Sequence, residues 1–309
     1  MPAVVLLGPQ RVRPALADAF EALKVKGPVA AVTAGWEERE DEIDELSEHL
    51  GRPVRNLKLH RRGEEVFQRD AELFLAVGDY LTRRREVRAA YRLRLGHAID
   101  AVRDVMRAGY GAALREEETE AAIGAVREVD ARHRERMTHL RGVFEAAWKP
   151  HEREVVARHR EEIGEVLEGA AALALAGGHV GILLDRLRLF GVAEMWDERP
   201  VFAWSGGAMV ASEDVVLFHD SPPQGAGHAE LLDAGLGLCR GVLPLPHARR
   251  RLALADPSRV ALLARRYLSL RCLALDEECR LTVSARGKVA VVRARELLPA
   301  GAVLDLPAA

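Results

Sequence analysis

The sequence predicts an α/β protein: a mostly parallel sheet, flanked by helices, that is interrupted by a long inserted α-helical hairpin. Two observations carry this expectation. Short apolar runs alternate with helical patterns near both ends of the 309-residue chain, as βαβ units require. Between them, residues 61–168 are dense in Arg and Glu, and their apolar residues recur at every third or fourth position. The predicted domains are therefore an α/β unit of residues 1–60 and 169–309, and a hairpin of residues 61–168.

The first sixty residues are predicted to contain three strands separated by two helices. Apolar runs rich in Val, Ala and Leu predict strands over 4–7, 29–33 and 54–59. Helical patterns over 14–23 and from about 36 to 50 lie between them. Strands that alternate with helices in this way are typical of a parallel sheet.

The middle of the chain is predicted to form two long antiparallel helices. One apolar series runs from 73 to 105 and a second from 123 to 144. A Gly-Tyr-Gly sequence at 109–111 provides the reversal, and Lys-Pro at 149–150 ends the second helix. Each arm would be on the order of 50 Å long, at 1.5 Å per residue. We expect the apolar seam to close the hairpin or to join a second copy in a homo-oligomer.

The last part of the chain returns to the α/β pattern. A helix is expected from about 182 to 189. The predicted strands are 170–176, 201–203, 270–275, 280–283 and 289–292, the last two joined by a turn at 286–287.

Composition narrows the functional classes. The net charge of −2 and the acids interleaved with the arginines argue against nucleic-acid binding. No apolar stretch is long enough for a membrane span, and the first residues have no signal-peptide layout, so we expect a cytoplasmic protein without membrane association. The three cysteines, Cys239, Cys272 and Cys279, have no metal-ligand spacing and are expected to be reduced thiols.

The strongest local signal for function is Ser205. An apolar run, Val-Phe-Ala-Trp, leads into this serine, which two glycines follow. This is the pattern of a nucleophile elbow, a sharp turn from strand to helix that exposes a hydroxyl at the end of a sheet. A serine nucleophile needs a base and a group that orients the base. The candidates downstream, among which chain geometry does not choose, are Asp214, His219, Asp220, His228, Asp233 and His247.

Five segments in order resemble a known family. They are residues 29–38, the glycine-rich segment 174–184, the serine motif 203–210, the His-Asp segment 219–225, and the segment 232–247, which ends in His247. Together they are similar to peptidase E (aspartyl dipeptidase) and cyanophycinase, serine hydrolases with the class I glutamine amidotransferase-like fold. The long helical hairpin has no counterpart in peptidase E, so substrate specificity does not follow from the resemblance.

The resemblance implies a catalytic triad. Ser205 would be the nucleophile, His247 the general base and acid, and Asp220 the residue that orients His247. The implied reaction is hydrolysis of a short peptide or an isopeptide-type amide through an acyl-enzyme, with no metal or organic cofactor. The alternative is a non-catalytic member that binds a partner through its helical insertion, because a fold does not by itself determine an activity.

The resemblance also implies the surroundings of the serine. Backbone N–H groups of Gly178 or Gly177, together with that of Gly206, would form the oxyanion hole. His179 and Trp204 would face the substrate, although His179 is equally suited to cap the helix that follows it.

Overall fold

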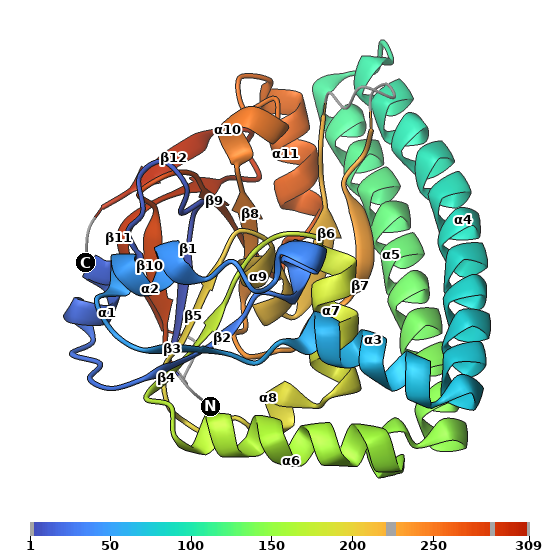
Figure 1. Ribbon diagram of the computed structural model, residues 1–309. Helices are drawn as coiled ribbons and strands as arrows, with labels where there is room; N and C mark the ends of the chain where they lie inside the picture. Colours follow the sequence, from blue (N-terminus) through green and yellow to red (C-terminus); the bar gives the residue numbers. More distant parts are fainter. Residues whose placement is uncertain (1–2, 221–226, 285–287, 308–309) are drawn as a thin grey trace.

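The computed structural model describes residues 3–220, 227–284 and 288–307. Its main sheet has the strand order β3-β2-β4-β5-β1-β10-β11-β9-β8, with β12 paired to β11 (Figure 1). The strands are β1 (Val4–Leu7), β2 (Val29–Val32), β3 (Val54–Asn56), β4 (Ala172–Leu175), β5 (Val201–Trp204), β6 (Asp214–Leu217), β7 (Glu230–Ala234), β8 (Val242–Pro246), β9 (Arg271–Leu275), β10 (Arg280–Val283), β11 (Val289–Leu297) and β12 (Val303–Leu306).

Helices cover both faces of this sheet. The 3₁₀ segments are η1 (Ala34–Arg39) and η2 (Pro150–Glu152). The α-helices are α1 (Leu16–Ala22), α2 (Asp44–Leu50), α3 (Leu59–Arg69), α4 (Ala71–Arg107), α5 (Ala112–Trp148), α6 (Glu154–Glu168), α7 (Val180–Leu189), α8 (Val192–Met195), α9 (Gly206–Ala211), α10 (Ala248–Arg251) and α11 (Pro257–Arg266).

The predicted α/β class and the mostly parallel sheet are confirmed, with one addition. Strands β3, β2, β4, β5 and β1 run parallel, and so do β9 and β8. Antiparallel pairings of β1 with β10, β10 with β11 and β11 with β9 join these two parallel parts. Strands β6 and β7 form a separate two-stranded sheet. The predicted turn at 286–287 lies outside the described residues.

Two of the predicted N-terminal elements differ from the structure: one helix is interrupted and one strand is shorter. The helix predicted from 36 to 50 is broken: η1 ends at Arg39 and α2 begins only at Asp44. Within η1 itself, Glu37 has φ 58° and ψ −122°, which are not helical and kink this segment. The strand predicted over 54–59 ends at Asn56, since Lys58 adopts a left-handed conformation and α3 starts immediately after it.

Between β3 and β4, the chain forms four helices rather than a simple hairpin. The two longest, α4 and α5, each have 37 residues and are therefore about 55 Å long. Asp70 separates α3 from α4. Its carboxylate caps α4 by accepting a hydrogen bond from Leu73 N. The same carboxylate pairs with Arg153 at the start of α6. The two ends of the α4–α5 pair are thus held together.

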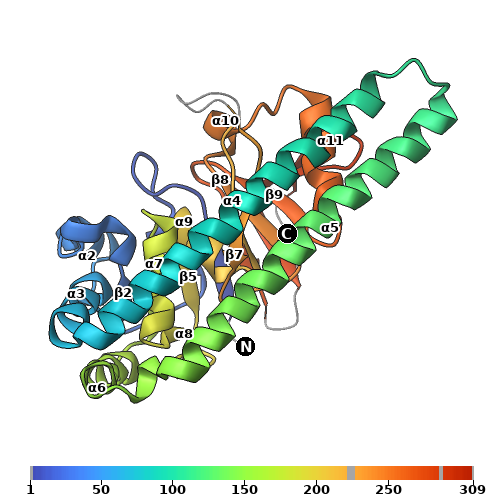
Figure 2. The same cartoon turned by 90° about the vertical axis from the view of Figure 1, so that its right-hand side faces the viewer.

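The α4–α5 pair lies along the α/β part of the molecule, and only the end with the reversal between the two helices extends beyond it (Figure 2). Helix α5 contacts β7 and α11. Buried apolar residues of both helices, including Leu95, Ile99, Ile123 and Val126, join the main hydrophobic core. The second, smaller core lies on the opposite side of the sheet, where Phe20 of α1 stacks on Phe202 of β5 at 3.8 Å.

A buried ion pair joins the long helices to α11. Both carboxylate oxygens of Asp130 accept hydrogen bonds of 2.6 Å from the Arg266 guanidinium. The Tyr91 hydroxyl donates to the same carboxylate at 2.8 Å and accepts a hydrogen bond from Leu231 N at 2.9 Å. Asp130 and Arg266 are only 6% and 5% exposed, so both charges are largely removed from water and depend on each other.

A second buried carboxylate repeats this arrangement. Asp233, which is fully buried in β7, lies 2.8 Å from Arg188, 3.3 Å from Arg141 and 3.6 Å from Arg84. These arginines belong to α7, α5 and α4. The long helices are therefore joined to the sheet by charges as well as by apolar contacts. None of the described helices is long and apolar enough to cross a membrane.

Candidate active site

Ser205 occupies the sharp turn between β5 and α9, as the sequence predicts. Its backbone has φ 52° and ψ −122°, a region that residues with a side chain rarely adopt. The turn is closed by packing, because a Cβ atom at Gly207 would lie 2.0 Å from the carbonyl oxygen of Leu175. Strain of this kind is maintained only where the surrounding structure enforces it, and it is concentrated at functional sites.

His247 lies beside this serine. It follows the last residue of β8 with φ 57° and ψ 33°, and its N–H donates to the carbonyl of Leu275 at 3.1 Å. This left-handed turn directs the imidazole toward the elbow, where its Nε2 atom lies 3.0 Å from Ser205 Oγ. A neutral imidazole at that distance can accept the hydroxyl proton.

The surroundings of His247 favour that neutral form. Burial of the half-buried ring lowers its pKa below the ordinary value of a histidine, and the positive charge of Arg251 lowers it further. Asp276 opposes the shift with its negative charge. A lowered pKa keeps the imidazole unprotonated near neutral pH, which is the state that a general base needs.

The glycine-rich loop after β4 lies against the serine. A Cβ atom at Gly177 would be 2.8 Å from Ser205 Cβ and 3.1 Å from Gly206 N. Gly178 has φ 109° and packs against the backbone of Gly35, whose carbonyl accepts a hydrogen bond from His179 N at 2.7 Å.

The backbone around the serine also leaves donors free. The N–H groups of Gly177, Gly178 and Gly206 donate to no backbone carbonyl among the described residues. Free N–H groups beside a nucleophile are the donors that an oxyanion hole requires.

Because Gly177 lies so close to Ser205, a larger residue at position 177 should slow the reaction of the serine. Gly177→Ala should reduce the rate at which Ser205 reacts by about 100-fold, because the new methyl group would displace the serine or the loop. Gly142→Ala, a position in α5 where a Cβ meets nothing within 4 Å, is the matched control. Equal rates for the two variants, measured with an activated ester, would show that Gly177 does not border the reacting hydroxyl.

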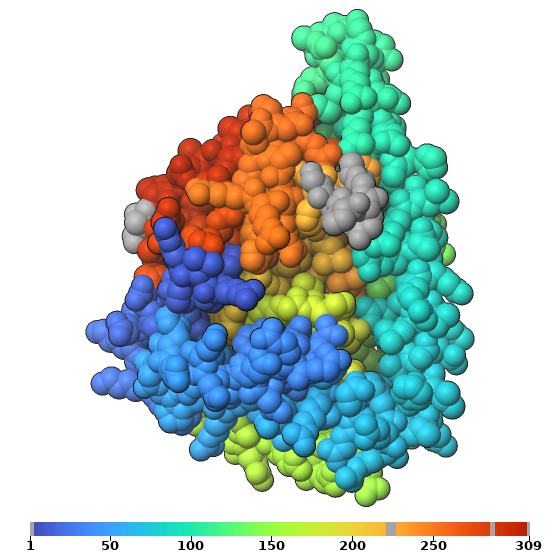
Figure 3. All heavy atoms as spheres, turned by 45° about the horizontal axis from the view of Figure 1, so that its top comes forward, coloured from blue at the N-terminus to red at the C-terminus, as the bar shows by residue number. Residues whose placement is uncertain are grey.

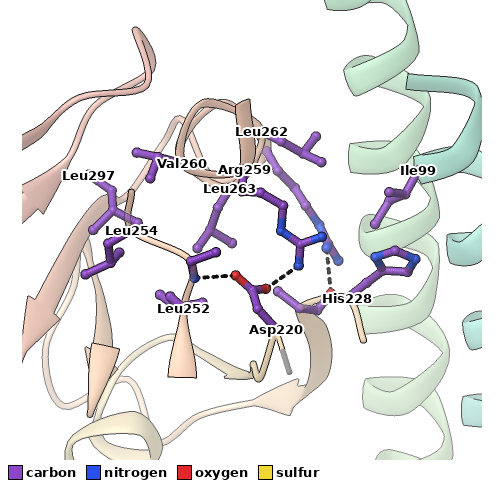
Figure 4. A pocket seen from close by; sticks show the side chains of 13 residues that line it. Ile99, Asp220, His228, Leu252, Leu254, Arg259, Val260, Leu262, Leu263 and Leu297 are labelled. Atoms are coloured by element: carbon purple, nitrogen blue, oxygen red, sulfur yellow. Dashed lines mark hydrogen bonds and ion pairs between the residues drawn. The ribbon is translucent and has the colours of Figure 1, made fainter. Parts of the chain in front are cut away.

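Asp220 does not take the role that the resemblance implies. One of its carboxylate oxygens accepts a hydrogen bond from Ala253 N at 2.6 Å, and the other pairs with Arg259 (Figure 4). No hydrogen bond joins Asp220 to His247 among the described residues. The physical reason is that β6, which precedes Asp220, lies outside the main sheet and directs the chain toward α11.

The negative charge that acts on His247 comes from a different strand. Asp276 and Glu277 follow β9, and β9 pairs in parallel with β8, so both strands end at the same edge. Asp276 accepts hydrogen bonds from Arg249 N at 2.9 Å and from Arg295 at 2.6 Å. The sequence shows that a strand ends just before these acids. It does not show that β8 and β9 are neighbours in the sheet, and this pairing is what brings the acids to the edge where His247 lies.

The other candidates lie elsewhere. Asp214 pairs with Arg134 of α5, and Asp233 is the buried partner of three arginines described above. His228 lies near Arg103 of α4, and burial lowers its pKa. His219 is half-buried just after β6. None of these four is hydrogen-bonded to Ser205 or His247 in the part of the chain that the structure describes.

The two residues expected to face a substrate have other roles. Trp204 is only 7% exposed and belongs to the smaller hydrophobic core, because alternate residues of a strand point to opposite faces. His179 is exposed, and its Nδ1 atom accepts a hydrogen bond from Ile182 N at 3.1 Å, which makes it the cap of α7.

The molecular surface has a hollow on the face that Figure 3 shows. In Figure 3, blue residues of the N-terminal segment, orange residues around α10 and the teal helix α4 surround a depression with yellow-green atoms at its floor. Two elements of this region, α7 and α10, follow the carboxyl ends of β4 and β8. In open α/β sheets this edge is where ligands bind.

Comparison with family models and with curated proteins finds no match for this chain. The described residues include no cluster of His, Cys, Asp or Glu suited to hold a metal ion. Cys239, Cys272 and Cys279 are buried free thiols, and burial raises the pKa of each.

Proposed function

We propose that the protein is a serine hydrolase that cleaves the amide of a short peptide or an isopeptide through an acyl-enzyme. The observation that carries this proposal is the 3.0 Å approach of His247 Nε2 to Ser205 Oγ at a strained strand-to-helix turn. The five sequence segments support a place in the peptidase E and cyanophycinase family, with its class I glutamine amidotransferase-like fold and an inserted helical hairpin.

The proposed reaction has two halves. Ser205 Oγ attacks the amide carbonyl carbon while His247 Nε2 takes the hydroxyl proton. The N–H groups of Gly177 or Gly178 and of Gly206 stabilise the oxyanion. When the carbon–nitrogen bond breaks, the imidazolium gives its proton to the leaving amine. Water then attacks the ester, with His247 as its base, and releases the acid and the free serine.

Asp276 is the proposed positioning residue in place of Asp220. Its negative charge favours the imidazolium that forms during each half of the reaction. Glu277, which also raises the pKa of His247, is the second acid at this edge. Asp276 is preferred because its effect on His247 is the larger and because two hydrogen bonds hold its carboxylate in place.

A fluorophosphonate probe tests the proposal directly. The wild-type protein should form a covalent adduct on Ser205, seen as a mass increase of one probe per chain, and Ser205→Ala should form none. Ser258→Ala, which changes an exposed serine at the start of α11, should label like the wild type. Absence of labelling in a folded wild-type protein would contradict the proposal.

The pH profile separates the two charged neighbours of His247. Arg251→Gln removes a charge that lowers the pKa of His247, so the acidic limb of kcat/KM should move to higher pH. Asp276→Asn removes a charge that raises this pKa, so the limb should move to lower pH. The Asp276→Asn rate at its optimum should also fall, because the imidazolium that forms during the reaction loses a stabilising negative charge. Shifts in the same direction would contradict these roles.

A second function stays open because of one observation. Among the described residues, no carboxylate is hydrogen-bonded to the Nδ1 atom of His247, and Asp220 is held by Arg259 instead. A protein without a working triad would serve as a scaffold that binds a partner through α4 and α5. Failure of the fluorophosphonate test would favour this function. A cytoplasmic location and homo-oligomerisation through the long helices likewise remain predictions.

A further inference from the structure

A large cavity lies at the open end of the α4–α5 pair, away from Ser205. Its volume is about 790 Å³. Its walls come from α3, α4, α5, α7 and α8, and Figure 2 shows these elements gathered at one end of the long helices. Neither Ser205 nor His247 lines it. Binding sites for small molecules have volumes of about 300–1,000 Å³, so this cavity is large enough for one.

Aromatic side chains from three helices line this cavity. Phe67 and Phe74 lie with their ring centres 6.0 Å apart, and Tyr80 stacks on Phe144 at 4.7 Å. Phe74 is 55% exposed and Leu81 is 36% exposed. When an apolar molecule covers apolar side chains that were in contact with water, the free energy of the system falls.

The positive charges of the cavity wall are already paired with protein carboxylates. Among the described residues, each of the four Arg and Lys side chains that line it has a carboxylate partner. The pairs are Arg186 with Glu64 at 2.5 Å, Arg188 with Asp233 at 2.8 Å, Lys149 with Glu152 at 3.2 Å and Arg141 with Asp233 at 3.3 Å. An anionic ligand would have to compete with these carboxylates and lose its own hydration. An uncharged ligand has neither cost.

We propose that this cavity binds an uncharged, largely apolar small molecule, with a ring system or hydrocarbon body that lies against Phe67, Phe74 and Phe144. The site is separate from the Ser205 hydrolase site and does not depend on it. A bound molecule would contact α4, α5 and α7 together, and would therefore stabilise the packing of the long helices on the α/β part.

Two fluorescent probes that differ by one charged group test the proposal. N-phenyl-1-naphthylamine is uncharged, and 1-anilinonaphthalene-8-sulfonate is the same ring system with a sulfonate. The uncharged probe should bind with a saturating rise in fluorescence at one site per chain. The sulfonated probe should bind at least about tenfold more weakly, because the wall offers it no unpaired cation.

Gly78 allows the cavity to be filled. It lines the cavity near the start of α4, and a Cβ atom there would meet nothing within 4 Å. Gly78→Leu should weaken binding of the uncharged probe by about tenfold or more without unfolding the helix, since leucine favours helix more than glycine does. Gly96→Leu, also in α4 with open space at its Cβ and away from the cavity, should bind the probe like the wild type.

The outcomes separate this site from the hydrolase site. Ser205→Ala should bind the uncharged probe normally, and the bound probe should not prevent fluorophosphonate labelling of the wild type. Equal binding of the two probes, or equal binding by Gly78→Leu and Gly96→Leu, would overturn the proposal. So would a wild-type dimer that Gly78→Leu converts to monomers, because a second copy would then be the occupant of the cavity.

Discussion

His247→Ala should lower the rate of Ser205 acylation by about 10⁴-fold or more, to a value close to that of Ser205→Ala. Without the imidazole, no other side chain of the described residues is hydrogen-bonded to the hydroxyl and able to take its proton. Nucleophile and base act as a unit, so removing either has nearly the full effect. The measurement is the second-order rate of labelling by the fluorophosphonate probe, followed by intact mass.

The control for this variant is another histidine of the chain. His139→Ala changes an exposed histidine of α5 and should leave the labelling rate unchanged. Added imidazole should restore part of the rate to His247→Ala, provided that it can enter the space left by the ring, and should leave Ser205→Ala inactive. A His247→Ala protein that labels as fast as the wild type would show that the 3.0 Å contact has no catalytic role.

Asp130→Ala should reduce the free energy of unfolding by about 3–5 kcal/mol, the cost of leaving one partner of a buried ion pair behind. Arg266 is 5% exposed, and without Asp130 its charge would have no hydrogen-bonded carboxylate among the residues that the structure describes. The Tyr91 hydroxyl would lose its acceptor as well. Urea unfolding followed by circular dichroism measures the change.

A matched variant separates this effect from loss of helix stability. Glu135→Ala removes an exposed carboxylate from the same helix and should change the free energy of unfolding by less than about 0.5 kcal/mol. The double variant Asp130→Leu with Arg266→Met should be more stable than Asp130→Ala, since it removes both buried charges. A loss of less than 1 kcal/mol in Asp130→Ala would mean that water reaches Arg266 in the native protein.

Local patterns were sufficient for much of the site. The elbow at Ser205 could be predicted because a strand, a serine and two glycines are consecutive, and backbone geometry depends on neighbours in the chain. The α/β class and most strands follow from apolar runs for the same reason. Strand ends were less predictable, since the strand predicted over 289–292 continues to Leu297 and the one predicted over 170–176 is only Ala172–Leu175. The proposed roles of Gly177, Gly178 and His247 came instead from the family resemblance, because chain geometry did not choose His247 from the other candidates.

Pairing between distant segments could not be predicted in this way. Asp220 and Asp276 both follow apolar strands, and nothing in their neighbouring residues distinguishes them. The difference is that β9 pairs with β8 in the main sheet, whereas β6 leaves the sheet and pairs with β7. Strand order is a property of the whole core, so the acid that acts on His247 became visible only in three dimensions.

The same contrast between local sequence patterns and contacts of distant segments holds for the long helices. Their helical nature and their reversal at 109–111 follow from the apolar period and from glycine, which are encoded locally. Their position along the α/β part depends on single carboxylates, Asp130 and Asp233, each paired with arginines far away in the chain. A sequence dense in Arg and Glu offers many such pairs. Only the folded core, by burying these two and excluding water, selects which charges must meet.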